Sequence, residues 1–465
     1  MNPDALINDL ITRARAAQAE YEKFDQRQVD DVVAAIAWTV MEPSRNRRLA
    51  EHAVQDTGLG DVDHKFSKNF RKTLGLLRDL TGTPSVGIIS EDTARGMVEI
   101  ARPVGVVGAI TPSTNPVATP TNKVMNALKG RNAIILAPSP RGEAVCGELI
   151  TLFQSALEAV GAPPALVQKM PAPMNKAATE LLMRAVDLVV ATGSQNNIRA
   201  AYSSGTPAVG VGAGNVAVIV DETAECPGVA EKILASKTFD NATSCSSENS
   251  VVVVDSAYDA LVASLESRGA LMLDVDAKMA LQQLMWSQGK LNPAVIAQPA
   301  EQIAQMAGIA GQSGKAIATL LVSETGTGPG YPFSGEKLCP VLTIYRVADF
   351  DAALAQVARI YSYQGAGHSV GIHTQNPDRP IRVGLELPTC RVIVNQVHCF
   401  ATGGSFDNAL PFSLSMGCGS WGGNSISENL NYRHYLNIVR VVTPIPAREV
   451  SPEDLLADYW SRYGK

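Results

Sequence analysis

The sequence is poor in several features that would assign it to particular classes of protein. Only 18% of its residues are charged, and the net charge of -6 comes without any cluster of basic residues, which argues against a nucleic-acid partner. Its seven cysteines form no CxxC pair, so we expect neither a disulfide framework nor a structural zinc site. The six histidines have no metal-ligand spacing, and we expect no metal. A small-molecule substrate is the remaining expectation.

Long apolar runs are also missing. No stretch reaches the roughly 18 residues that a membrane-spanning helix needs, so the sequence predicts no membrane association. Residues 1–24 carry Asp4, Asp9, Glu20 and Glu22 among their apolar positions, a pattern that is unlike a signal peptide. We therefore expect a cytoplasmic protein.

What the sequence does contain is typical of an α/β fold. Hydrophobic residues make up 46% of the 465 residues but aromatics only 5%, and this length fits two domains. Helical spacing of apolar residues predicts opening helices over 6–17 and 29–41. Two β-prone runs, 86–89 and 97–101, flank a polar stretch and predict a hairpin.

Strands and helices then alternate in the rhythm of right-handed βαβ units, which build parallel sheets. The predicted strands of this half are 104–110, 132–137, 166–169, 187–191 and 216–220, and the predicted helices are 119–129, 143–160, 175–184 and 195–203. A second series of strands is predicted at 249–254, 317–321, 341–345, 369–373 and 392–395. The sequence thus predicts a Rossmann-type cofactor domain over 1–235, with 86–101 as an oligomerisation arm, and an α/β catalytic domain over 236–425. The segment 426–465 would add an edge strand, 436–442, to a small β oligomerisation element.

Cys245 is the strongest candidate for a reactive side chain. It lies between a predicted helix, 230–239, and the strand that follows, where a side chain can be both fixed and accessible. A cysteine that merely fills space is the alternative. Its small polar neighbours Ser244, Ser246 and Ser247 pack poorly in a core and favour the reactive interpretation.

Two glycine motifs differ in how strongly they indicate a phosphate-binding turn. Residues 417–422 satisfy GxGxxG, but no apolar strand leads into them, so we reject a dinucleotide turn there. Gly210, Gly212 and Gly214 fit either a phosphate turn or a close backbone crossing.

The sequence pattern alone does not decide the roles of three further residues. His368 follows glycines and precedes an apolar strand, which suits a site residue, although a lone histidine is more often structural. Glu336 and Lys337 could form an ordinary solvated pair.

At these motifs the chain resembles the CoA-acylating branch of the aldehyde dehydrogenase superfamily, over nearly its full length. The segments that carry the resemblance are 111–116, 128–135, 191–193, 202–205, 210–215, 245–248, 337–341, 365–368, 403–406 and 417–425. The resemblance implies an aldehyde dehydrogenase-like fold. It also implies that Cys245 is the nucleophile, that Asn115 is an oxyanion or positioning donor, and that Glu336 contacts the nicotinamide ribose.

Other roles follow from the same resemblance. The expected cofactor-binding residues, besides Glu336, are Thr111, Pro112, Ser139, Arg141, Gly142, Gly193 and Ser194. His368 is a possible catalytic residue or CoA contact. We also expect a homodimer or homotetramer.

The expected deacylation step depends on a glutamate that this chain lacks. Hydrolytic members of the superfamily have a glutamate in a Glu-Leu-Gly-Gly-Lys segment, whereas residues 210–215 of this chain contain no carboxylate. Because a thiolate needs no such base near neutral pH, the thioester is expected to pass to coenzyme A. A hydrolytic dehydrogenase and a catalytically inactive relative are the alternatives.

Local differences between this sequence and those of its relatives indicate the cofactor and the substrate. NAD-dependent relatives often carry Lys-Pro-x-Glu where this chain has residues 139–142. Here Gly142 stands in place of the carboxylate and Arg141 lies beside it, so a 2′-phosphate would meet a cation rather than a like charge. We therefore expect NADP, with NAD as the alternative. The chain is similar to enzymes for sulfoacetaldehyde and succinate semialdehyde, whose distal anion would need donors such as His398, Ser405 and Asn408. The His398-Cys399-Phe400 sequence differs from the succinate-semialdehyde pattern and favours sulfoacetaldehyde, converted to sulfoacetyl-CoA.

Overall fold

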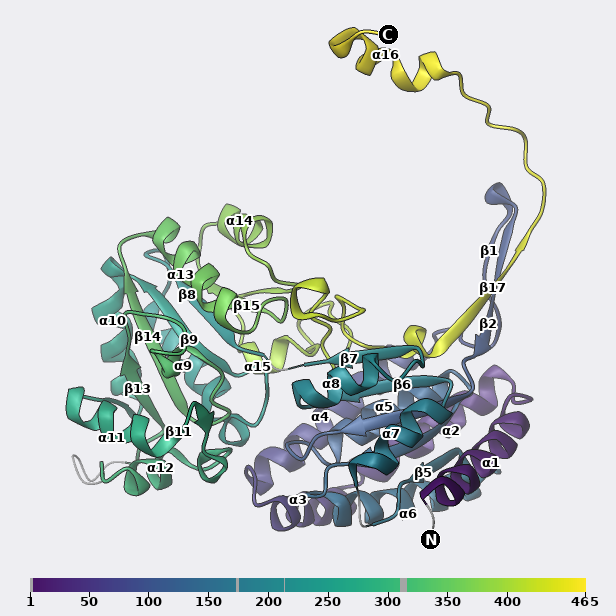
Figure 1. Ribbon diagram of the computed structural model, residues 1–465, viewed down its shortest axis with the longest axis horizontal. Coiled ribbons are helices and arrows are strands. Elements are labelled where there is room, and N and C mark those ends of the chain that lie inside the picture. Colours follow the sequence, from purple (N-terminus) through teal and green to yellow (C-terminus); the bar gives the residue numbers. More distant parts are fainter. Residues whose placement is uncertain (1–2, 173–174, 213, 310–315) are drawn as a thin grey trace.

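The computed structural model describes residues 3–172, 175–212, 214–309 and 316–465. The chain forms two α/β lobes side by side and an extended arm that leaves the first lobe (Figure 1). Within these residues, no helix has both the length and the apolar character needed to cross a membrane.

The first lobe is built on a five-stranded parallel sheet of order β5-β4-β3-β6-β7. Its strands are β3 (Val106–Thr111), β4 (Ala133–Pro138), β5 (Val167–Lys169), β6 (Leu188–Thr192) and β7 (Ala208–Val211). Its helices are α1 (Pro3–Tyr21), α2 (Gln26–Met41), α3 (Pro43–Thr57), α4 (Val62–Leu80), α5 (Ala118–Lys129), α6 (Glu143–Ala159), α7 (Lys176–Ala185) and α8 (Gln195–Tyr202). The strand order reverses between β3 and β6, and ligands of such sheets bind at the carboxyl ends of the strands beside that point.

The second lobe contains a seven-stranded parallel sheet of order β10-β13-β14-β9-β8-β15-β16. Its strands are β8 (Val216–Val220), β9 (Glu248–Val254), β10 (Ala270–Met272), β13 (Thr319–Ser323), β14 (Val341–Val347), β15 (Val370–His373) and β16 (Val392–Val394). Its helices are α9 (Cys226–Thr238), α10 (Asp255–Glu266), α11 (Val275–Met285), α12 (Ala300–Met306), α13 (Phe350–Tyr363), α14 (Asp378–Glu386) and α15 (His398–Ala401), and a two-stranded β11 (Trp286–Ser287) and β12 (Lys290–Leu291) lies beside α11. Separate apolar clusters pack on the two faces of the sheet, which explains why its central strands are uniformly apolar.

The passage between the lobes lies earlier than the sequence predicts. Strand β8 is in the middle of the second sheet, between β9 and β15, so the chain changes lobes before Val216 rather than at residue 235. The alternating pattern identifies β8 as a strand but carries no information about which sheet it joins. Later in the chain, Leu430 and Tyr435 return to the core of the first lobe.

The arm is a three-stranded antiparallel sheet of order β1-β2-β17. The predicted hairpin is formed by β1 (Gly87–Asp92) and β2 (Met97–Pro103), and β17 (Leu436–Val442) pairs with β2 of its own chain at the sheet edge. Beyond β17 an extended segment leads to α16 (Pro452–Tyr463), which stands away from both lobes (Figure 1). The sequence analysis did not identify α16.

Candidate active site

Cys245 lies in the loop between α9 and β9, and this loop begins with an unusual backbone. Asp240, Asn241 and Ala242 have φ values of 52°, 50° and 58°, so three consecutive residues other than glycine are left-handed. Each such residue costs on the order of 1 kcal/mol or more, and the conformation persists only where its surroundings hold it.

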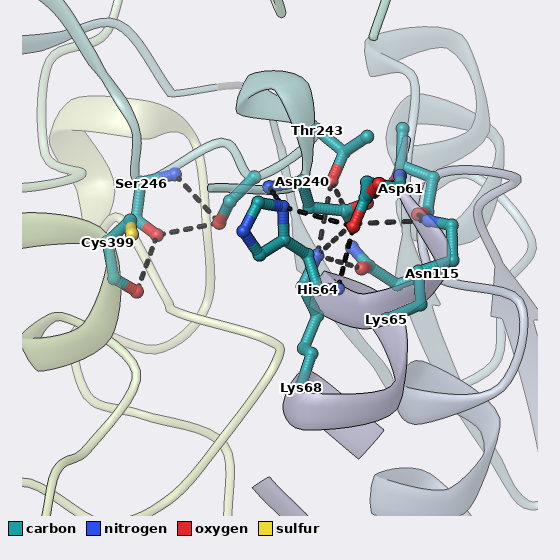
Figure 2. A network of polar contacts seen from close by, with 11 residues as sticks. Asp61, His64, Lys65, Lys68, Asn115, Asp240, Thr243, Ser246 and Cys399 are labelled. Atoms are coloured by element: carbon teal, nitrogen blue, oxygen red, sulfur yellow. Dashed lines mark hydrogen bonds and ion pairs between the residues drawn. The ribbon is translucent and has the colours of Figure 1, made fainter. Parts of the chain in front are cut away.

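Helix α4 of the first lobe holds this loop through Asp240 (Figure 2). The buried Asp240 carboxylate accepts hydrogen bonds from Lys65 Nζ at 3.2 Å, from Thr243 Oγ1 at 2.6 Å and from the Asp61 backbone N–H at 2.8 Å, and it also contacts Lys68 Nζ. Burial by itself would raise the pKa of Asp240, but the ammonium groups of Lys68 and Lys65 lower it to about 2. The loop is therefore anchored by an ionised, fully bonded carboxylate.

The same network orients Asn115. Lys68 Nζ donates to Asn115 Oδ1 at 2.8 Å, and because an ammonium can only donate, the amide oxygen must face the lysine. The amide nitrogen, Nδ2, is left as a donor with no hydrogen-bond partner among the described residues. Asn115 and Cys245 line one cavity, as the proposed role of Asn115 requires.

Most of the expected cofactor-binding residues line a cavity of about 800 Å³. Those that line it are Thr111, Pro112, Ser139, Arg141, Gly193, Ser194 and Glu336. They come from the carboxyl ends of β3, β4 and β6 and from the facing lobe, so the cavity lies at the strand-order reversal of the first sheet. Gly142 does not line it: this residue precedes α6 with φ 102°, and an added Cβ would lie 2.9 Å from Pro116 Cβ.

The surroundings of the Cys245 thiol raise its pKa to about 12: burial is the largest cause and the neighbouring Glu336 adds to it, whereas the Arg391 guanidinium acts in the opposite direction. Burial also raises the pKa of Glu336 to about 8, so this carboxyl group is mostly neutral at pH 7. Arg391 donates to the backbone oxygens of His368 at 2.7 Å and Gly417 at 2.9 Å, and it has no carboxylate partner within the described ranges.

Gly214 lies between Cys245 and His368. A Cβ on Gly214 would lie 2.4 Å from the Cys245 backbone oxygen and 3.0 Å from His368 Cδ2, so the close-crossing interpretation of this glycine is right. Gly210, by contrast, belongs to strand β7. His368 is buried behind the loop and lines neither of the two cavities at the site; its Nδ1 lies 2.8 Å from Ser369 Oγ.

A second cavity, of about 280 Å³, adjoins the first and shares Asn115, Ser244, Leu414 and Met416 with it. Of the three expected substrate residues, only Ser405 lines this cavity. His398 is buried, with Nδ1 2.9 Å from the Ser246 backbone oxygen, and Asn408 Nδ2 donates to Gln396 Oε1 at 3.0 Å. Both side chains organise the wall around the cavity.

Helix α4 contributes basic side chains to the site that were not predicted from the sequence. Lys65, Lys68, Arg71 and Lys72 lie on this helix at spacings of three and four residues, and all but Lys65 line the second cavity. Their spacing was a usable signal for one basic helix face.

Two other sequence interpretations are resolved. The GxGxxG segment 417–422 forms a loop with a short 3-10 turn, Ser420–Gly422, and no βαβ unit, so its rejection as a dinucleotide turn is confirmed. The interpretation of Glu336 and Lys337 as a solvated pair is wrong, because Lys337 is fully buried and donates to the Phe333 backbone oxygen at 2.6 Å.

The chain is similar to known aldehyde dehydrogenases in both sequence and structure. Residues 3–407 match the model of the aldehyde dehydrogenase family. The chain is 58% identical over 456 residues to a sulfoacetaldehyde dehydrogenase (acylating) of Cupriavidus necator, covering 98% of this chain and 92% of the relative. It is 38% identical to a succinate-semialdehyde dehydrogenase (acetylating) of Clostridium kluyveri, covering 95% and 96%. The crystal structure of an acetylating aldehyde dehydrogenase from Geobacillus thermoglucosidasius superposes with a TM-score of 0.92 at 35% identity, covering 97% and 98%.

Proposed function

The chain belongs to the aldehyde dehydrogenase family, and from this premise we propose that it oxidises sulfoacetaldehyde with NADP and coenzyme A to sulfoacetyl-CoA, through a thioester on Cys245. The observation that carries the acylating reaction is the closed backbone beside the nucleophile. An added Cβ on Gly214 would lie 2.4 Å from the Cys245 backbone oxygen. The segment 210–215 has no carboxylate, and Gly214 has no room for one, which supports transfer to a thiol over hydrolysis.

The residues of the large cavity fit a dinucleotide. Thr111 ends β3, Ser139 follows β4 and Gly193 follows β6, at the carboxyl ends of strands where nucleotide phosphates and riboses bind in doubly wound sheets. Ser194 begins α8, whose first backbone N–H groups favour anions. When bound, the nicotinamide would accept a hydride from the substrate carbon.

The chain's own residues supply the remaining chemistry. The Cys245 thiol releases its proton to solvent as its sulfur attacks the aldehyde carbon, and Asn115 Nδ2 and the Cys245 backbone N–H are the donors for the oxyanion that forms. The Arg391 charge partly offsets the effect of burial on the Cys245 pKa, and because burial leaves Glu336 mostly neutral near pH 7, the repulsion between Glu336 and a Cys245 thiolate is reduced. Oxidation leaves a thioester, whose carbonyl the thiol of coenzyme A attacks to release Cys245.

Arg141 supports the choice of NADP. Its side chain is exposed at the cavity and makes no hydrogen bond or ion pair in the described part of the chain, so it is available to a 2′-phosphate. Gly142 follows it, so no carboxylate at that position repels a phosphate or competes for the ribose hydroxyls.

The choice of aldehyde is supported by the identity of 58% to the Cupriavidus necator relative, against 38% to the Clostridium kluyveri relative. Succinate semialdehyde is therefore the second candidate, and its distal carboxylate carries the same sign of charge as a sulfonate.

The arm supports assembly with a second copy of this chain. Strand β17 is a sheet edge, and Val439, Val441, Leu455 and Tyr463 expose apolar surface along β17 and α16. An exposed edge and apolar helix of this kind are usually covered in soluble proteins. Light scattering of the purified protein should give the mass of a dimer or a tetramer.

The deciding experiment is NADPH formation from sulfoacetaldehyde with and without coenzyme A. Strict dependence on coenzyme A is expected. Turnover without it would overturn the acylating reaction, and far faster turnover of succinate semialdehyde would replace the substrate while leaving the reaction intact.

A further inference from the structure

The cavity beside Asn115 has a charge distribution that the reaction itself does not require. Its lining contains Lys68, Arg71 and Lys72, all from one face of α4, and no carboxylate among the described residues. Hydroxyl groups of Ser67 and Ser405 and the rings of Phe239, Phe400 and Phe412 complete its walls. A neutral aldehyde would gain nothing from this concentration of positive charge.

The three cations differ in what they can offer a ligand. Lys68 Nζ is used by Asn115 Oδ1, Thr243 Oγ1 and the Asp240 carboxylate, which also balances its charge. Lys72 Nζ donates to the backbone oxygens of Phe400 at 3.2 Å, Gly403 at 3.1 Å and Gly404 at 3.0 Å. An ammonium has three donors, so neither lysine keeps a free one.

Lys72 nevertheless supplies uncompensated charge. Its ammonium group is enclosed by carbonyl groups and lies 5.2 Å from the centre of the Phe412 ring, and it has no carboxylate partner in the part of the chain that the structure describes. Burial lowers the pKa of Lys72 to about 8, which still leaves it mostly charged at pH 7. A buried charge without a counter-ion is costly, and a bound anion would reduce that cost.

Arg71 keeps its donors free. Its guanidinium lies 5.6 Å from the centre of the Phe406 ring and makes no hydrogen bond or ion pair with any described residue. The planar fork of an arginine can donate two hydrogen bonds to one oxyanion group. Along α4, Arg71 and Lys72 lie one turn, roughly 5 Å, beyond Lys68, which holds the oxyanion donor Asn115.

From this arrangement we propose that Arg71, in the positive field of Lys72, binds the anionic group at the far end of the aldehyde. The inference rests on the proposed function for the identity of the substrate. Because Lys68 bonds Asn115 and Arg71 follows Lys68 by one helical turn, both ends of the substrate would bind beside the same stretch of α4, which suits an aldehyde with only a few bonds between its carbonyl and its anion. A sulfonate and a carboxylate share the chemistry that this subsite recognises, and the sulfonate has one more oxygen for the Ser67 or Ser405 hydroxyl.

A binding experiment can test the subsite without turnover. Calorimetric titration of the Cys245→Ala protein with ethanesulfonate, propanoate and the neutral compound 1-propanol should show binding of an anion and not of the alcohol. Adding Arg71→Gln should weaken anion binding at least tenfold. Arg78→Gln is the matched control, because Arg78 lies on the same helix, 5.3 Å from the same Phe406 ring, but does not line the cavity. Failure of both anions to bind, or an equal loss in the Arg78 variant, would overturn the subsite.

Kinetics separate this proposal from the proposed function. In Arg71→Gln, KM for sulfoacetaldehyde should rise at least tenfold while kcat/KM for propanal stays within twofold. An equal loss on both aldehydes would contradict anion recognition. If the unmodified enzyme does not oxidise sulfoacetaldehyde at all, the proposed function fails, and the ethanesulfonate titration still decides whether Arg71 binds anions.

Discussion

Lys68 Nζ lies 2.8 Å from Asn115 Oδ1, so a residue of α4 determines which end of the Asn115 amide faces the active-site cavity. The same lysine contacts Asp240, whose left-handed backbone begins the loop that carries Cys245. One side chain therefore connects the proposed oxyanion donor, Asn115, to the loop of the proposed nucleophile, Cys245. This arrangement makes Lys68 a positioning residue.

Replacing Lys68 by Met should lower kcat by about 10- to 100-fold with little change in KM, because an unrestrained amide donates less effectively to the oxyanion. Steady-state kinetics would measure this. In an Asn115→Ala background the same change should cost less than about threefold, since the donor to be positioned is gone. Lys65→Met is the matched control, as Lys65 also pairs with Asp240 but bonds the Thr114 backbone oxygen rather than the Asn115 side chain. Equal effects of the two lysine variants on kcat would contradict positioning.

Cys245→Ser should lower acyl transfer at least about a thousandfold, because the thioester cannot form. Mass spectrometry of the protein after incubation with aldehyde and NADP, without coenzyme A, should detect an acyl adduct only when Cys245 is present. Cys390, the other cysteine with partial exposure, provides the comparison. An active Cys245→Ser enzyme, or an adduct on Cys390, would show that the nucleophile is misassigned.

Gly214→Ala should displace the nucleophile, because the new Cβ would lie 2.4 Å from the Cys245 backbone oxygen. A shift of about 1 Å can cost about 100-fold in kcat. Both kcat and the rate of Cys245 alkylation by iodoacetamide should change. Gly330→Ala, where an added Cβ meets nothing within 4 Å, should leave both unchanged. Normal activity of the Gly214 variant would mean that the crossing is not tight.

Arg141→Ser should raise KM for NADP about tenfold and change KM for NAD by less than twofold, because the lost charge serves only a 2′-phosphate. Initial rates with each cofactor give the comparison. Arg184→Ser controls for loss of charge, because Arg184 is exposed on α7 and does not line the cavity. Equal increases for both cofactors would rule out selection by Arg141.

Burial lowers the pKa of His373 to about 3, so on acidification the unfolded chain takes up a proton near pH 6.5 that the folded protein does not. The stability associated with this residue is therefore present above pH 6.5 and is lost as the pH falls below it. As the pH falls from 6 to 4, the free energy of unfolding of His373→Gln should decrease less steeply than that of the parent protein, by about 1.4 kcal/mol per pH unit. Urea unfolding at several pH values measures the difference between variant and parent.

That comparison must be made as a difference, because other buried groups titrate in the same range. Burial raises the pKa of Glu248 to about 7 and that of Glu336 to about 8, so these folded carboxyl groups gain protons before the unfolded chain does and stabilise the protein as the pH falls. They are present in both proteins and cancel. Identical pH slopes would mean that His373 is protonated in the folded state.

Much of the fold was predictable because it depends on local pattern. The buried run of β3 and the helix of α6 were expected within about two residues of their observed bounds, since apolar period and flanking glycines are local signals. The boundary between the lobes was not, because β8 has the same apolar composition whichever sheet it joins. Helix α16 was missed although Ser451 and Asp454 form a capping box at its start.

By itself, the sequence determined where the proposed reactive element lies: it has a cysteine among small polar residues, the strand and helix pattern of a parallel sheet that is expected to bind the cofactor, and a segment 210–215 without a carboxylate. Only the tertiary structure decided the surroundings of that cysteine. It buried His398 against Ser246 and placed Arg71 and Lys72 at the cavity instead. The physical reason is that burial and charge at a site depend on which distant segments pack together, and α4 meets the Cys245 loop across nearly 180 residues of chain, as the separation of 179 between Asp61 and Asp240 shows.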